Sequence, residues 1–174
     1  MAQVMPILVD SNILCRLARS DDPQHAVAKQ AVELCLQRQE ELLLTPQAQR
    51  EFWVVATRPR EKNGLGLSPS QAAQRLTDFE QFSTFVPDTP AVHQNWRRLV
   101  AQHQVSGKDA HDAAFVAAMQ AHSVSQILTF NAEDFHRYQG QITILTPEQL
   151  AVERQQELDL QQQRSRERDQ GIDL

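Results

Sequence analysis

Residues 7–14 have the sequence ILVDSNIL, and this stretch sets the beginning of the fold. The apolar run from Pro6 to Val9 is typical of a buried strand, and it ends at Asp10. Ser11 and Asn12 are residue types that often begin helices, and apolar residues then recur at helical spacing. The stretch therefore predicts a strand that passes directly into a helix, with a carboxylate at the junction.

Short apolar runs alternate with stretches of helical periodicity along the rest of the chain. Further strands are expected at 42–44, 85–86, 126–129 and 142–145. Further helices are expected at 23–37, 47–57, 70–82, 91–103 and 110–122, with one helical turn at 132–137. Such alternation predicts an α/β fold, in which helices cover both faces of a parallel sheet and ligands bind at the carboxyl ends of the strands.

The composition is that of an ordinary globular protein, with 174 residues of which 41% are hydrophobic and 22% charged. We expect one domain over residues 1–147, followed by a polar C-terminal helix or mobile tail at 148–174. No stretch approaches the roughly 20 apolar residues of a membrane span, and the first residues lack the pattern of a signal peptide, so a cytoplasmic location is expected. Cys15 and Cys35 have neither metal-ligand nor redox spacing and are expected in the core.

The formal net charge of -5 argues against a protein that coats nucleic acid nonspecifically, because basic side chains drive phosphate binding. It does not exclude a nuclease, since the acids of a metal site contribute negative charge themselves.

Four acids stand at predicted strand ends, or on helices that could face those ends: Asp10, Glu51, Asp112 and Asp134. Mg²⁺ and Mn²⁺ prefer oxygen ligands, and a pair of such ions can activate water and stabilise the leaving oxygen of a phosphodiester. The chain has no Ser-His-acid arrangement, nucleophile elbow or Gly-rich phosphate loop. Metal-and-water chemistry is therefore indicated, although each acid alone could equally cap a helix or lie solvated on the surface.

Four segments resemble, in order, the motifs of the PIN-domain family. They are ILVDSNIL for the first motif, TPQAQREFWVVATRP for the second, SGKDAHDAAFVAAM for the third and LTFNAEDF for the fourth. Together they span roughly residues 6 to 147, and the NGLGLS segment after the second motif is similar to a loop in a toxin-like branch of the family. The resemblance implies a PIN-like three-layer α/β/α fold around a central, mostly parallel sheet of about five strands.

Carried over residue by residue, the resemblance makes Asp10, Glu51 and Asp112 metal ligands and catalytic residues. The fourth position differs between family members, so either Asn131 or Asp134 could hold metal, water or substrate. We favour Asp134 as the acid and Asn131 as a supporting residue.

Several neighbours of these acids have alternative roles. Ser11 could orient water or phosphate and could also cap the helix that it begins, while Asn12 is expected to brace the acids through its amide. Asp109 is interpreted as a helix cap, and His111 as a packing or hydrogen-bonding residue outside the mechanism. The basic residues that could hold RNA phosphates, or simply be solvated, are Arg50, Arg58, Arg60, Lys62 and Lys108.

The resemblance implies a ribonuclease dependent on Mg²⁺ or Mn²⁺, similar to the VapC toxins of bacterial toxin-antitoxin pairs. It further implies an RNA substrate, a cognate antitoxin protein and a homodimer. An alternative is a catalytically weak PIN fold that binds RNA or protein, and the four filled acidic positions argue against it. A phosphatase of the haloacid dehalogenase type would need a second Asp where Asn12 stands.

Overall fold

Five parallel strands form the centre of the computed structural model, which describes residues 5–170. Their order is β3-β2-β1-β4-β5, and every neighbouring pair is parallel. The strands are β1 (Ile7–Val9), β2 (Leu42–Leu44), β3 (Thr84–Phe85), β4 (Gln126–Leu128) and β5 (Thr143–Leu145). The predicted α/β class and the five-stranded parallel sheet are confirmed.

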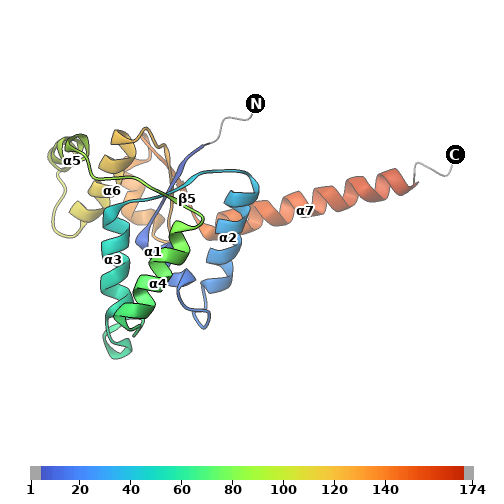
Figure 1. Cartoon of the computed structure of the whole chain (residues 1–174). Coiled ribbons are helices and arrows are strands. Elements are labelled where there is room, and N and C mark those ends of the chain that lie inside the picture. The colour runs from blue at the N-terminus through green and yellow to red at the C-terminus, as the bar shows by residue number, and fades with distance from the viewer. Residues whose placement is uncertain (1–4, 171–174) are drawn as a thin grey trace.

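Helices lie on both sides of this sheet (Figure 1). The α-helices of residues 5–170 are α1 (Ser11–Leu17), α2 (His25–Gln37), α3 (Pro46–Thr57), α4 (Pro69–Glu80), α5 (Pro90–Gln102), α6 (Asp109–Ala121) and α7 (Pro147–Gln170). Two 3-10 helices, η1 (Arg60–Lys62) and η2 (Ala132–Tyr138), complete the described elements. The predicted ranges agree with these bounds to within two residues at each end, which is the usual uncertainty of helix and strand ends.

The central strands are buried on both faces, as their continuous apolar sequences predict. Every residue of β1 and β2 is buried, whereas both residues of the edge strand β3 are exposed. Burying one Leu or Ile side chain contributes about 1.5–3 kcal/mol to folding. Burial of the central strands therefore provides stabilisation that can offset the cost of burying polar groups at the ends of those strands.

Three polar side chains are buried among the described residues, and each directly follows a strand. Asp10 comes after β1, Thr45 after β2 and Thr129 after β4. Because neighbouring strands run parallel, these three residues meet at the same carboxyl edge of the sheet. The fold thus places the buried Asp10 carboxylate beside the buried Thr129 hydroxyl.

Helix α3 carries Glu51 from the end of β2 to this edge. Its N-cap is Thr45, whose side chain accepts a 3.1 Å hydrogen bond from the amide of Ala48. Pro46 occupies the first helical position, where its missing N–H costs nothing. Buried Phe52 meets Phe79 of α4 edge-on, with ring centroids 5.3 Å apart. This packing fixes the rotation of α3 about its axis.

The NGLGLS loop, residues 63–68, folds back onto the end of α3. Three loop amides donate hydrogen bonds of 2.8 to 2.9 Å to carbonyls of the last turn: Leu65 to Val55, Gly66 to Arg58 and Leu67 to Ala56. These carbonyls have no partner within the helix, so the loop satisfies groups that would otherwise need water.

Helix α7 leaves the body of the domain and extends away from it (Figure 1). Its first turns contact the domain through buried Leu150 and through two ion pairs with Arg38, the residue after α2. Arg38 pairs with Glu153 at 3.1 Å and with Glu157 at 2.6 Å. The division into a domain at 1–147 and an appendage at 148–174 stays a prediction, and residues 171–174 lie outside the described part. No helix of residues 5–170 has the length and apolar character needed to span a membrane.

A Gly64→Ala substitution tests the packing of the loop. A Cβ at Gly64 would stand 1.9 Å from the carbonyl oxygen of Arg58. This oxygen belongs to the backbone, so it cannot move aside as the end of a flexible side chain could. We expect the free energy of unfolding to fall by about 1–3 kcal/mol in urea titrations. Gly140→Ala is the matched control, because nothing lies within 4 Å of a Cβ there. Equal stability of the two variants would contradict this account of the loop.

Candidate active site

Asp10 is held at the sheet edge by neutral hydrogen-bond donors. Its side chain is 6% exposed, and Oδ2 accepts hydrogen bonds from Thr129 Oγ1 at 2.7 Å and from Asn12 Nδ2 at 2.8 Å. Oδ1 accepts a weaker bond from Ser11 Oγ at 3.2 Å. The predicted bracing by the Asn12 amide is therefore confirmed.

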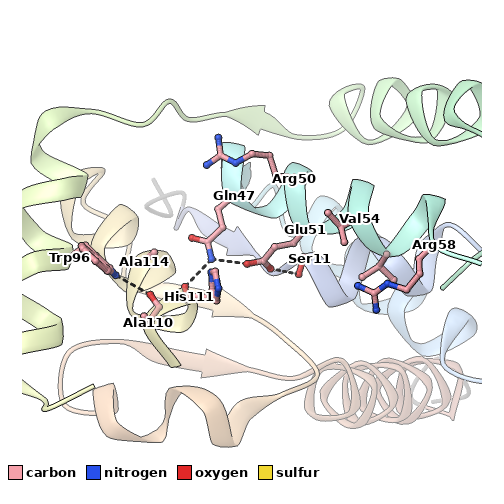
Figure 2. Close-up of a pocket in the computed structure, with 11 residues that line it drawn as sticks. Ser11, Gln47, Arg50, Glu51, Val54, Arg58, Trp96, Ala110, His111 and Ala114 are labelled. Carbon is pink, nitrogen blue, oxygen red and sulfur yellow. Dashed lines mark hydrogen bonds between the residues drawn. The ribbon is translucent and has the colours of Figure 1, made fainter. Parts of the chain in front are cut away.

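Glu51 joins the site through Ser11 and Gln47. The Ser11 hydroxyl lies 2.7 Å from Glu51 Oε2, and Gln47 Nε2 donates to Glu51 Oε1 at 2.8 Å. The same Gln47 nitrogen also donates to the carbonyl oxygen of His111 at 2.8 Å, so Glu51 links α3 to α1 and Gln47 links α3 to α6 (Figure 2). The predicted capping role of Ser11 is wrong, because Asp10 is the N-cap of α1 and no side chain caps it. The Ser11 hydroxyl serves a tertiary contact instead.

Asp112 and Asp134 complete the group of acids. They line one pocket of about 310 Å³ together with Glu51, Lys108 and His111. Asp112 lies in the first turn of α6, and Asp134 lies in the first turn of η2. Asn131, the alternative for the fourth position, does not line this pocket, and its backbone N–H donates to Thr129 Oγ1 at 3.0 Å.

The pKa values of two acids report how close the carboxylates are. The pKa of Asp10 is raised from 3.8 to about 6, chiefly by burial and in part by the charge of Glu51, while the hydrogen bond from Thr129 opposes the shift. The pKa of Asp112 is raised to about 7 by burial together with the charges of Asp134 and Asp10. Both carboxylates are thus less easily ionised than in water, because neighbouring negative charges and desolvation disfavour the charged form.

None of the four acids has a basic partner among the described residues. Ten ion pairs with N–O distances up to 4.0 Å occur in this part of the chain, and none involves Asp10, Glu51, Asp112 or Asp134. Asp109, by contrast, pairs with Arg137 at 2.7 Å. Its predicted role as a helix cap is wrong, since Lys108 is the N-cap and Asp109 is the first residue of α6.

The donor set of this cluster fits a divalent cation. Carboxylate oxygens are the ligands that Mg²⁺ and Mn²⁺ prefer, and an uncompensated group of acids attracts positive charge. Within residues 5–168, no three His, Cys, Asp or Glu side chains stand together in a metal-binding arrangement. The oxygens of Asp10 and Glu51 instead accept hydrogen bonds from neutral groups. Each carboxylate oxygen has more than one lone pair, so it can accept such a hydrogen bond and still bind a cation.

The PIN domain family matches residues 7–141. The chain belongs to this family. No curated protein sequence is similar enough to this chain to count as a relative.

Solved structures share the fold of this PIN domain. VapBC2 from Rickettsia felis, bound to a DNA fragment from its promoter, aligns with a TM-score of 0.60 and 13% identity over 82% of this chain and 98% of that one. A toxin-antitoxin complex from Klebsiella pneumoniae aligns with a TM-score of 0.55 and 21% identity, over 81% of this chain and 97% of that one. The VapC20 toxin of Mycobacterium tuberculosis, which cleaves the sarcin-ricin loop, aligns with a TM-score of 0.54 and 17% identity. The alignment covers 74% of this chain and 92% of that one. At these identities, the similarity shows the fold alone.

Several of the basic residues named from the sequence border the site of the PIN domain. Lys108 lines the acid pocket, while Arg50 and Arg58 line a larger groove beside it. Arg60 and Lys62 lie in η1 and border neither.

The predicted core positions of the two cysteines are confirmed, since both are buried and unpaired.

Thr129 and Gln47 were not singled out from the sequence. Thr129 is fully buried and bonds to Asp10, 119 residues away, and Gln47 connects Glu51 to the backbone of α6. The signal available for Thr129 was its position: a hydroxyl residue directly after an apolar strand, in the same place as Asp10. For Gln47, spacing offers a signal, because a residue four positions before Glu51 lies on the same helix face.

Replacing Asp112 by Asn is expected to stabilise the metal-free protein. Asp112 holds its proton more tightly in the folded chain than at its ordinary pKa of 3.8, so its contribution to stability is present below about pH 4 and is lost as the pH rises through about 7. Asn keeps the shape and removes the charge. Because Asp112 is partly exposed, we expect a gain of only about 1 kcal/mol at pH 8 in EDTA.

Thermal unfolding at pH 8 and at pH 4 measures this effect. The two proteins should differ at pH 8 and converge at pH 4. Asp109→Asn is the matched control on the same helix turn, and it should bring no gain because it removes the pair with Arg137. A melting temperature of Asp112→Asn below that of the wild type at pH 8 would overturn the assigned repulsion.

Proposed function

We propose that this PIN domain is a metal-dependent endoribonuclease that hydrolyses RNA phosphodiester bonds, and that it is the toxin of a toxin-antitoxin pair. The observation that carries the proposal is a group of four carboxylates. Glu51, Asp112 and Asp134 line one pocket, and Asp10 lies next to Glu51, since the Ser11 hydroxyl contacts both. Among the described residues, none of the four forms an ion pair within 4.0 Å. Such a group lowers stability unless it binds a cation, so its retention is explained by chemistry rather than by folding.

Mg²⁺ or Mn²⁺, when bound, supplies activation of water and stabilisation of the leaving oxygen. The side chains of this protein hold the proposed metal ligands in position. Asp10 is oriented by Thr129 and Asn12, and Glu51 is oriented by Ser11 and Gln47. Donors that fix the ligands in this way preorganise a metal site. We assign Asp10, Glu51, Asp112 and Asp134 as metal ligands and catalytic residues, and Ser11, Asn12 and Asn131 as supporting residues.

The biological role is proposed from the structural neighbours. One is a toxin that cleaves the sarcin-ricin loop, and others are toxin-antitoxin complexes. By analogy, this chain would act on RNA, be held inactive by a cognate antitoxin protein, work in the cytoplasm and form a homodimer. Sedimentation of the purified chain tests the homodimer.

A catalytically weak PIN fold that binds RNA or protein is the alternative. It predicts that the acids can be changed without loss of biological effect. Within the described residues the four acids form no ion pair, which favours the nuclease, because a binding surface has no need to keep repelling charges together.

Cleavage of RNA by the purified chain tests the proposal directly. With Mg²⁺ or Mn²⁺ we expect cuts at discrete positions, and none in EDTA. Asp10→Asn and Asp112→Asn should each lower the cleavage rate by at least about 100-fold, since even partners of metal ligands are commonly worth 10- to 100-fold. Asp109→Asn should cut like the wild type. Identical cleavage patterns from the wild type and Asp112→Asn would refute the assignment.

Thr129→Val tests whether orientation of Asp10 matters. The variant keeps the shape of the side chain but removes the 2.7 Å hydrogen bond. We expect a rate about 10- to 100-fold lower at limiting metal, with recovery as the Mg²⁺ concentration rises, because a misaligned ligand weakens metal affinity. A titration of rate against Mg²⁺ concentration measures the shift. A lower rate that no metal concentration restores would mean that Thr129 has a role other than positioning.

A further inference from the structure

A groove of about 660 Å³ opens beside the acid pocket, between α3 on one side and α5 and α6 on the other (Figure 2). Glu51 and His111 line both the groove and the acid pocket. A molecule held in the groove would therefore lie directly against the proposed metal ligands. Its volume is in the range of sites that bind small ligands, about 300–1,000 Å³.

One face of α3 forms the first wall of the groove. The residues of this face recur at helical spacings of three and four, and the C-cap residue Arg58 follows them: Gln47, Arg50, Glu51, Val54, Val55 and Arg58. The face thus carries a cation on each side of the carboxylate, with an apolar patch between Glu51 and Arg58. Val54, at the middle of that patch, is 55% exposed although it is apolar.

Both arginines are free to bind an anion. The Arg50 side chain is 70% exposed, and its partner Asp88, at 3.4 Å, is itself 53% exposed, so that ion pair is weak. Arg58 forms no ion pair with any described acid within 4.0 Å. Its backbone, however, is fixed, because the NGLGLS loop bonds to its carbonyl and packs Gly64 against it. The loop thereby fixes the backbone position from which the Arg58 side chain extends at the far end of the groove.

An aromatic ring stands in the opposite wall. Trp96 of α5 donates from its indole Nε1 to the carbonyl oxygen of Ala110 at 2.9 Å, and the ring of His93 stacks against it with centroids 5.9 Å apart. The two contacts fix the orientation of the indole, which remains partly exposed in the groove. A fixed aromatic ring in a groove is a stacking platform for a base.

We infer that this groove binds a single-stranded stretch of RNA next to the bond that is cut, with Arg50 and Arg58 on backbone phosphates and Trp96 against a base. The inference rests on the proposed function. Grooves that hold single strands combine cations that follow the backbone with aromatic rings that stack bases, and this groove has both. A base must be unstacked to reach Trp96, so a duplex is not the occupant.

Binding of a fluorescein-labelled oligoadenylate RNA of about 12 nucleotides, followed by fluorescence anisotropy, tests the inference. The background is the full chain carrying Asp112→Asn with Mg²⁺ present, so that binding is read without cleavage. Arg50→Gln plus Arg58→Gln should weaken binding and lower the slope of log affinity against log salt by about 1.4, or about 0.7 for each phosphate that is no longer neutralised. Trp96→Ala should weaken binding by about 5- to 100-fold, and Trp96→Phe should restore most of it.

Arg97→Gln is the matched control, because Arg97 is exposed and lies next to Trp96 outside the groove. It should leave the affinity unchanged. If Trp96→Ala does not fold, the double variant Arg50→Gln plus Arg58→Gln still tests the inference, because both side chains are exposed and their replacement does not disturb the core. Unchanged affinity and salt slope in the double arginine variant would overturn the inference and favour a protein occupant. A wild type that cuts no RNA would refute the proposed function separately, because binding is measured apart from cleavage.

Discussion

Repulsion among four carboxylates is the constraint around which the rest of this structure is arranged. Asp10 and Asp112 have raised pKa values because each is desolvated and lies near other acids. Hydroxyl and amide donors bond to Asp10 and Glu51, and none of the four acids forms an ion pair within the described part of the chain. Neutral donors fix the carboxylates in position without cancelling their charge, so the cluster keeps its attraction for a cation at the cost of some stability.

The parallel sheet makes this arrangement possible. β1 lies between β2 and β4, so residues that directly follow these strands lie at one edge of the sheet, even where they are 119 positions apart, as Asp10 and Thr129 are. The strands are only three residues long and fully apolar at the centre. Their burial supplies the stabilisation that a desolvated acid opposes. A mixed sheet would send some strand ends to the opposite edge and would scatter the same residues.

The elements of the fold could be predicted because their signals are local. A change from an apolar run to helical periodicity within a few residues predicts the transition from β1, which ends at Val9, through Asp10 into α1. The partners of Asp10 could not be predicted in the same way, because the bond to Thr129 depends on the register between β1 and β4. Ser11 shows the limit of a local rule: it is a good capping residue by type, yet its hydroxyl contacts Glu51, 40 residues away.

Helix α3 shows why the site and the fold cannot be varied separately. Its buried face, with Phe52 at the centre, sets the rotation of the helix, and that rotation alone decides that Glu51 points to Ser11. A turn of one residue would move each side chain by about 100° around the axis and would expose the core face as it removed the acid. The loop after α3 restrains the same helix through the carbonyls of Val55 and Arg58. One set of packing contacts therefore sets the position of the carboxylate, the apolar patch and the cation of the groove together.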